Sequence, residues 1–134
     1  MALTENNNKE IFAQKSRGIL RALHQAEEYV EASAIVSRDG LMVASLLSAE
    51  SDADRFGAMC ASLLALASKA ATEVDRGELR QVILDGTKGP MLLTHIGKFA
   101  VLAVAARPAK TSLGKLIMET RAAAAKLAEI GNAL

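Results

Sequence analysis

The segment from Leu79 to Pro108 constrains the fold of this chain more than any other part of it. It indicates three strands joined by short turns at 85–90 and 97–98, because Val, Ile, Leu and Met fill the strands while Gly and Pro mark the breaks. Strands joined by short turns pair in antiparallel fashion. The apolar residues are consecutive rather than alternating, and such strands need cover on both faces. The segment therefore predicts a sheet sandwiched between helices, with no catalytic residues spaced along it.

The length favours a single folded domain, and the composition argues against binding to nucleic acid. The 134 residues carry a net charge of +1, with acids and bases intermixed, so a broad basic surface for nucleic acid is not expected. Aromatic residues make up 3%, which argues against a base-stacking platform. Cys60 is the one cysteine, so no internal disulfide can form. There is no signal-peptide pattern, and the apolar strings are too short to cross a bilayer, so a soluble cytoplasmic protein is expected.

The rest of the chain supplies three helices and one further hairpin. The polar, Asn-rich residues 1–8 predict a flexible tail, followed by a single domain over 9–134. We expect helices over 9–28, 52–75 and from Thr111 or Ser112 to 130, and strands over 34–36 and 41–47. Asn8 is the expected cap of the first helix, while Gly77 and Gly131 are expected to end the second and third. Asp39-Gly40 is expected to supply the positive φ angles of the hairpin turn.

Two stripes of different size run along the second helix. The large stripe, expected to lie on the sheet, consists of Phe56, Met59, Cys60, Leu63, Ala67, Ala70 and Val74. The small stripe consists of Ala58, Ala61, Ser62, Ala65 and Ser68. Small side chains permit the close approach of another helix. The alternative is that alanine simply favours helix and this face is solvated.

The strand from Leu79 to Leu84 gives a second indication of a partner. As the first strand of a three-stranded meander it is a candidate for a sheet edge, and Arg80 is its one charged residue. An apolar edge tends to be covered or paired, and pairing across a two-fold axis would continue the sheet into a second subunit. The alternative is that a strand of the first hairpin covers it within the same chain.

The residues that could carry chemistry have simpler structural interpretations. Gly86–Gly89 resembles a fragment of a phosphate loop but leads into a strand, so a hairpin turn is expected. Cys60 lies among apolar residues and is expected to be a small core residue. His24 and His95 have no nearby cysteine or carboxylate pair, so no metal site is predicted. Arg107, Lys110 and Lys115 near the third helix could hold an anion but are common in solvated loops. No catalytic residue, metal or cofactor is predicted.

Three strings, in this order, resemble the roadblock family, which includes dynein light chains and bacterial regulators of Ras-like GTPases. They are Ala34–Ala44, with its Asp-Gly turn; Val82–Ile96; and Phe99–Val104 followed by Leu113–Leu116. The resemblance implies an α/β (α+β) profilin-like sandwich with the order α-β-β-α-β-β-β-α. Two helices would cover one face of a five-stranded antiparallel sheet, and the second helix the other. It also implies homodimers, formed by pairing the third strands and packing the second helices side by side.

The resemblance further implies a regulator without enzyme activity that binds a small Ras-like GTPase. We therefore expect a homodimeric regulator or scaffold; the alternatives are a small-molecule sensor domain and a structural subunit of a larger complex. The residues expected at the dimer interface are Arg80, Val82 and Leu84 on the strand, with Ala58, Ala61, Ser62 and Ala65 on the helix. The candidates for the GTPase surface are Arg55, Lys69 and Glu73.

Overall fold

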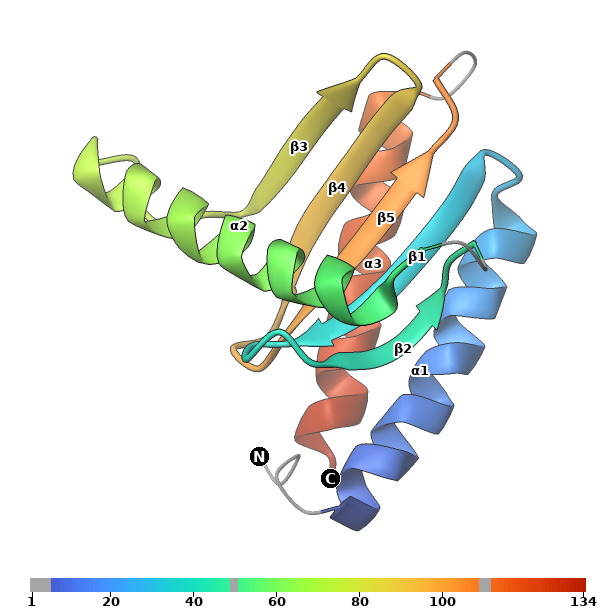
Figure 1. The fold of residues 1–134 in the computed structure, drawn as a ribbon. Coiled ribbons are helices and arrows are strands. Elements are labelled where there is room, and N and C mark those ends of the chain that lie inside the picture. The colour runs from blue at the N-terminus through green and yellow to red at the C-terminus, as the bar shows by residue number, and fades with distance from the viewer. Residues whose placement is uncertain (1–5, 49–50, 109–111) are drawn as a thin grey trace.

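The computed structural model describes residues 6–48, 51–108 and 112–134, and its elements follow the predicted order (Figure 1). The helices are α1 (Asn6–Ala26), α2 (Ala53–Glu73) and α3 (Leu113–Asn132). The strands are β1 (Val30–Ser37), β2 (Met42–Leu46), β3 (Gln81–Gly86), β4 (Gly89–Ile96) and β5 (Ala100–Ala106). The predicted fold class and order of elements are confirmed.

All five strands form one antiparallel sheet with the order β2-β1-β5-β4-β3. The last strand, β5, lies in the centre, since it pairs with both β1 and β4. The first hairpin therefore occupies one edge and β3 the other. The prediction that β3 is an edge strand is confirmed, and the alternative that the first hairpin covers it is wrong.

Two hydrophobic cores hold the helices on opposite faces of the sheet. On one face, Phe12 and Leu20 of α1 and Leu116 and Leu127 of α3 are fully buried against side chains such as Leu102. The other face is covered by α2, which runs across the strands (Figure 1). Its core consists of Ala34, Val36, Cys60, Leu64, Leu93, Val101 and Ala103. The implied sandwich, with one helix opposite two, is confirmed.

Cover on both faces is complete at the centre of the sheet and fails at β3. Almost every residue of β5 is buried, as two-sided packing requires. In β3, however, Ile83 and Leu84 remain exposed although they lie in an apolar run of the kind that predicted cover. The expectation of two-sided cover is therefore wrong for this strand, because a sheet edge extends beyond the helices packed on it.

The first helix begins earlier than predicted. Asn6, Asn7 and Asn8 already belong to α1, so Asn8 is not its cap, and the helix ends at Ala26. Asparagine is tolerated in a first turn, where backbone N–H groups have no partner within the helix. Residues 1–5 of the predicted tail lie outside the described residues.

Asp75, rather than Gly77, terminates α2. Asp75 has a φ of 55°, and its N–H donates to the carbonyl of Thr72. The N–H of Arg76 donates to the carbonyl of Ala71, which completes the hydrogen-bond pair of a Schellman motif. Gly77 also has a positive φ, but it follows the motif. The helix begins as predicted, since the Asp52 side chain accepts a hydrogen bond from the N–H of Arg55.

The third helix starts at its expected cap but passes its expected stop. The Ser112 hydroxyl accepts a hydrogen bond from the N–H of Lys115, while Thr111 lies outside the described residues. Gly131 is buried inside α3, which continues to Asn132. The prediction for Gly131 is wrong because a glycine without a side chain packs here against the core instead of leaving the helix.

The hairpin between β1 and β2 fixes the position of α2. Gly40 has a φ of 89°, whereas Asp39 does not enter the left-handed region, so one residue rather than two supplies the positive φ. A Cβ at Gly40 would lie 3.2 Å from the Cα of Ala58, and a Cβ at Gly57 would lie 3.0 Å from the carbonyl oxygen of Gly40. The two glycines therefore permit the start of α2 to approach the turn closely.

Candidate functional site

The outward side of α2 carries six exposed residues at regular spacing, which we call the outer stripe. Its members are Arg55, Met59, Ser62, Leu66, Lys69 and Glu73. The intervals alternate between four and three residues, the repeat of a helix that packs against another helix. Met59 and Leu66 are 60% and 64% exposed, although burial of such side chains is favourable. The outer stripe is therefore a candidate contact surface.

The free edge of β3 extends this surface. β3 pairs with β4 in unbroken register from Gln81 to Gly86 and has no strand on its other side among the described residues. It contains no proline, and Asp85 is its one charged residue, so the usual protections of an open edge are missing. The opposite edge, β2, is shorter and has an irregular register. Because the C-terminal end of α2 extends past β3, helix and edge border each other (Figure 1).

The three residues predicted for the strand interface lie in different environments. Arg80 is exposed and directly precedes β3. Val82 is half-buried and packs against the core under α2, so much of its surface already has a partner. Leu84 is 37% exposed and is available at the edge.

The four residues predicted for the helix interface also differ in their exposure. Ala58, Ser62 and Ala65 are exposed on α2. Ala61 is half-buried and faces the hairpin, since its Cβ lies 3.7 Å from where a Cβ of Gly40 would stand.

The candidates for the GTPase surface, Arg55, Lys69 and Glu73, are all exposed members of the outer stripe. They alternate with Met59, Ser62 and Leu66 instead of forming a surface of their own. The residues expected at the GTPase surface and Ser62, expected at the helix interface, therefore lie on the same face of α2.

Sequence reasoning missed Met59 and Leu66 as surface residues. Of the large stripe, Phe56, Cys60 and Leu63 pack in the core under α2 as predicted. Met59 and Val74 are instead 60% and 62% exposed, and Ala70 is exposed as well, whereas Gly57 and Leu64 are buried. The error came from choosing the buried face by side-chain size, although a glycine allows a helix to approach a sheet closely. The alternating spacing of four and three residues is the signal that identifies the stripe.

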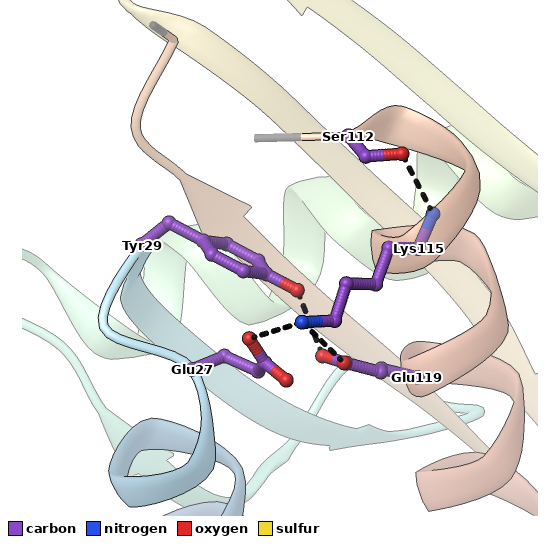
Figure 2. Close-up of polar contacts among 5 residues, drawn as sticks. All are labelled: Glu27, Tyr29, Ser112, Lys115 and Glu119. Carbon is purple, nitrogen blue, oxygen red and sulfur yellow. Dashed lines mark hydrogen bonds and ion pairs between the residues drawn. The ribbon is translucent and has the colours of Figure 1, made fainter. Parts of the chain in front are cut away.

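A polar cluster joins the loop between α1 and β1 to the start of α3 (Figure 2). The Tyr29 hydroxyl donates a 2.8 Å hydrogen bond to Oε2 of Glu119. Nζ of Lys115 lies 3.4 Å from Oε2 of Glu27 and 3.9 Å from Oε1 of Glu119. Lys115 thus bridges one carboxylate from the loop after α1 and one from α3, and the cluster ties the start of α3 to that loop.

The pKa values in this cluster reflect its two neighbouring carboxyl groups. The hydrogen bond with Glu119 lowers the pKa of Glu27, while burial and then that same contact raise the pKa of Glu119. Burial and the bond to Glu119 raise the pKa of Tyr29. One carboxyl therefore holds a proton more readily than the other, and Tyr29 remains a neutral donor. These groups serve packing between helices, because each is already engaged with another.

The remaining residues that could take part in chemistry are buried or make structural contacts. Burial raises the pKa of the Cys60 thiol to about 11, which opposes formation of a nucleophilic thiolate. Nε2 of His24 lies 2.8 Å from the Ser33 hydroxyl. Gly86 and Gly89 pair across the β3–β4 turn, as predicted. Among the described residues there is no group of three or more potential metal ligands, and no helix is long and apolar enough to cross a membrane.

The anion site considered near the third helix is not assembled. Nε of Arg107 lies 3.3 Å from Oε1 of Glu31, and Lys115 is held by the two glutamates. Lys110 lies outside the described residues.

Comparison with known proteins identifies relatives in sequence and solved structures of similar fold. The model of the Roadblock/LC7 domain matches residues 17–106. The uncharacterized protein MJ1340 of Methanocaldococcus jannaschii is 32% identical over 100 residues, which cover 75% of this chain and 86% of that protein. The structure of Myxococcus xanthus MglB has a TM-score of 0.81 at 21% identity, covering 90% of this chain and 97% of the other. A structure described as MglB with tetrameric arrangement has a TM-score of 0.79 at 17% identity, covering 90% of each chain.

Proposed function

The chain belongs to the Roadblock/LC7 domain family, and on that premise we propose that it is a homodimeric regulator or scaffold that binds a small Ras-like GTPase. Roadblock/LC7 domains are regulatory and non-catalytic, and the side chains that could carry chemistry here are engaged in packing. We propose further that residues 9–134 act as a single domain. The observation that carries the proposal is the outer stripe of α2 beside the open edge of β3.

A second copy of the chain fits both features at once. Pairing of two β3 strands would satisfy the free backbone groups of the edge. The same two-fold axis would bring two α2 helices together, because each α2 extends past its own β3. The proposed interface comprises Leu84 and Arg80 at the edge, Ser62 within the outer stripe, and Ala58 and Ala65 beside it. Val82 and Ala61 would contribute through their exposed fractions.

The spacing of the outer stripe permits an antiparallel pairing. The intervals of four, three, four, three and four residues are the same in both directions, so a two-fold axis near Leu64 maps the stripe onto itself. Arg55 then faces Glu73 of the second copy, and Ser62 faces Leu66. Opposite charges would meet at both ends of the contact, which favours this register over one that places like charges together.

Leu66→Glu tests the dimer directly. A carboxylate inside an apolar contact is costly to desolvate, so the variant should be monomeric at concentrations at which the natural chain is dimeric. Light scattering coupled to size exclusion gives the mass. Met118→Glu is the matched control, since Met118 is 73% exposed on α3 and lies outside the proposed interface. Equal masses for the natural chain and Leu66→Glu would contradict the helix contact.

The partner is tested with nucleotide-loaded GTPases. Each small Ras-like GTPase of the same genome is loaded with GDP or with a non-hydrolysable GTP analogue, and its affinity for the chain is measured. A preference of about tenfold, or 1.4 kcal/mol, would identify a regulator or effector of the switch. Equal affinities would identify a constitutive scaffold, because such binding cannot shift the switch. Lack of binding to every candidate would reject the GTPase part of the proposal.

A further inference from the structure

An open cavity of about 380 Å³ lies beside α3, where β4 ends and β3 begins. Its wall on the helix side is formed by Arg121, Ala124, Ala125 and Ala128, and Thr94 of β4 lines the sheet side. The adjacent Ala124 and Ala125, with Ala128 one turn further along α3, leave the space that larger side chains would fill. The volume lies within the range of small-molecule sites. Of its lining residues, Arg80 also belongs to the proposed dimer interface.

The charge of the cavity has one sign. Its eight lining residues include two arginines and a histidine and no acid, in a chain with almost equal numbers of acids and bases. Among the described residues, the guanidinium of Arg80 makes no ion pair or hydrogen bond. The guanidinium of Arg121 has one contact, in which Nε donates to Oε1 of Gln81 at 3.3 Å. That partner is neutral, so the positive charge of neither arginine is balanced within the cavity.

A buried hydroxyl provides an independent observation. Thr94 is 5% exposed, and its Oγ1 is buried with no hydrogen-bond partner in the described part of the chain. Buried polar groups nearly always have partners, so an orphaned one calls for an explanation. Thr94 lines the same cavity as the two arginines. An anion held by the guanidiniums would give this hydroxyl an acceptor, either directly or through one ordered water.

We infer that this cavity binds a small organic anion. A carboxylate or phosphate group would lie between Arg80 and Arg121, because the guanidinium fork matches both groups in two parallel hydrogen bonds. A short apolar part would lie over Ala124 and Ala128. All eight lining residues come from one chain, so the site is complete without a GTPase, and a monomeric variant shows whether the dimer contact of Arg80 affects binding.

The test is a titration of the isotope-labelled protein, followed by amide chemical shifts, with inorganic phosphate, acetate and butyrate at constant ionic strength. Saturable shifts at Thr94, Gly97 and Ala125 are expected for at least one of the three. Saturation by phosphate alone would assign a phosphorylated ligand. Tighter binding of butyrate than of acetate would assign a carboxylate with an apolar part. The absence of saturable shifts with all three probes would overturn the inference.

Matched variants separate a built site from general attraction of anions. Arg80→Gln and Arg121→Gln should each raise the dissociation constant at least tenfold, and Thr94→Val should raise it by a smaller factor. Arg17→Gln is the control, because it removes the same charge from an exposed position on α1. Equal losses of anion affinity in the control and in the cavity variants would show that the protein attracts anions nonspecifically and has no built site. The titration is repeated on Leu66→Glu, so that loss of the dimer is not mistaken for loss of the site.

Discussion

Thr94 shows how a single residue can oppose stability. Its side chain shares the α3 face of β4 with Leu92 and Ile96, which are fully buried, and its hydroxyl has no partner among the described residues. Leaving a buried hydroxyl unsatisfied costs about 1–3 kcal/mol. This cost is what a bound anion would offset under the proposed role in binding.

Thr94→Val should therefore raise the free energy of unfolding by about 1 kcal/mol, because valine has the same shape and no polar atom. Urea unfolding measures the change. Thr120→Val is the matched control, since Thr120 is also buried but its Oγ1 donates to the carbonyl of Ile117 at 3.0 Å. The control should lose stability. A loss in both variants would mean that the Thr94 hydroxyl has a partner after all.

His24 makes the stability depend on pH near neutrality. Burial lowers its pKa from the value of 6.5, so the folded chain binds this proton less readily than the unfolded chain. The contribution of neutral His24 is complete above pH 6.5 and is lost as the pH falls from there towards the lowered native pKa. His24→Gln should reduce the loss of stability between pH 7.5 and 5.5, by at most about 1.4 kcal/mol per pH unit.

The measurement is urea unfolding of both proteins at the two pH values. Glutamine retains a polar group that can reach the Ser33 hydroxyl, so the comparison isolates titration from the loss of the 2.8 Å contact. Burial also lowers the pKa of His95, and the natural and variant chains share that contribution. Parallel pH profiles for the two proteins would show that His24 titrates alike in both states.

Among the elements, α2 is defined by its ends. Its start is fixed by the Asp52 cap and by the approach of Gly57 to the hairpin. Its end relies on Asp75 in a left-handed conformation, which costs most residues about 1–2 kcal/mol and costs glycine little. The C-terminal half of α2 is largely exposed beyond the sheet, so its stability depends on this local motif more than on packing.

Replacement of Asp75 should change stability in opposite directions for two small residues. Asp75→Gly should raise the free energy of unfolding by about 0.5–1 kcal/mol, because glycine adopts the positive φ without strain. Asp75→Ala should lower it by about 1 kcal/mol, because alanine adopts that conformation at the full cost. Both substitutions remove the same charge from the helix end, so denaturant unfolding of the pair isolates the backbone effect. Similar values for the two variants would contradict the Schellman ending.

At the scale of the whole molecule, one side of the sandwich is held by internal polar contacts, and the other exposes apolar residues and an unpaired strand edge. The polar cluster of Glu27, Tyr29, Lys115 and Glu119 holds the molecule together on the side where the end of α1 meets α3 (Figure 2). On the opposite side, β3 and the outer stripe expose apolar residues and an unpaired edge. The proposed two-fold assembly would cover this side.

Charge reversal across the proposed axis tests the assembly and its register together. Arg55→Glu and Glu73→Arg should each raise the dissociation constant of the dimer several-fold, since two symmetric pairs of like charges worth about 0.2–1 kcal/mol each would meet. The double variant should restore it, and high salt should reduce all three effects. Sedimentation equilibrium gives the constants. A double variant as weak as the singles would reject the antiparallel register.

The sequence by itself determined the order of the elements, the antiparallel sheet and the open edge at β3. These depend on local chemistry: Gly40 and the Gly86–Gly89 turn permit tight reversals, and consecutive apolar residues in β4 and β5 require cover on both faces. The sandwich architecture and the proposed partners were predicted from the family resemblance. The stripe chosen by residue size correctly placed Phe56, Cys60 and Leu63 of α2 in the core but misplaced Met59 and Val74, because the close packing of Gly57 was not considered.

Tertiary structure alone decided which exposed and buried groups come together. Arg80, Thr94 and Arg121 come from different elements, and their meeting in one cavity depends on how α3 lies across the end of β4. The orphaned hydroxyl of Thr94 and the one-sided charge of the cavity likewise follow from packing between distant segments. Such contacts are set by the relative position of helix and sheet, which sums many weak interactions along the chain and leaves no local pattern to read.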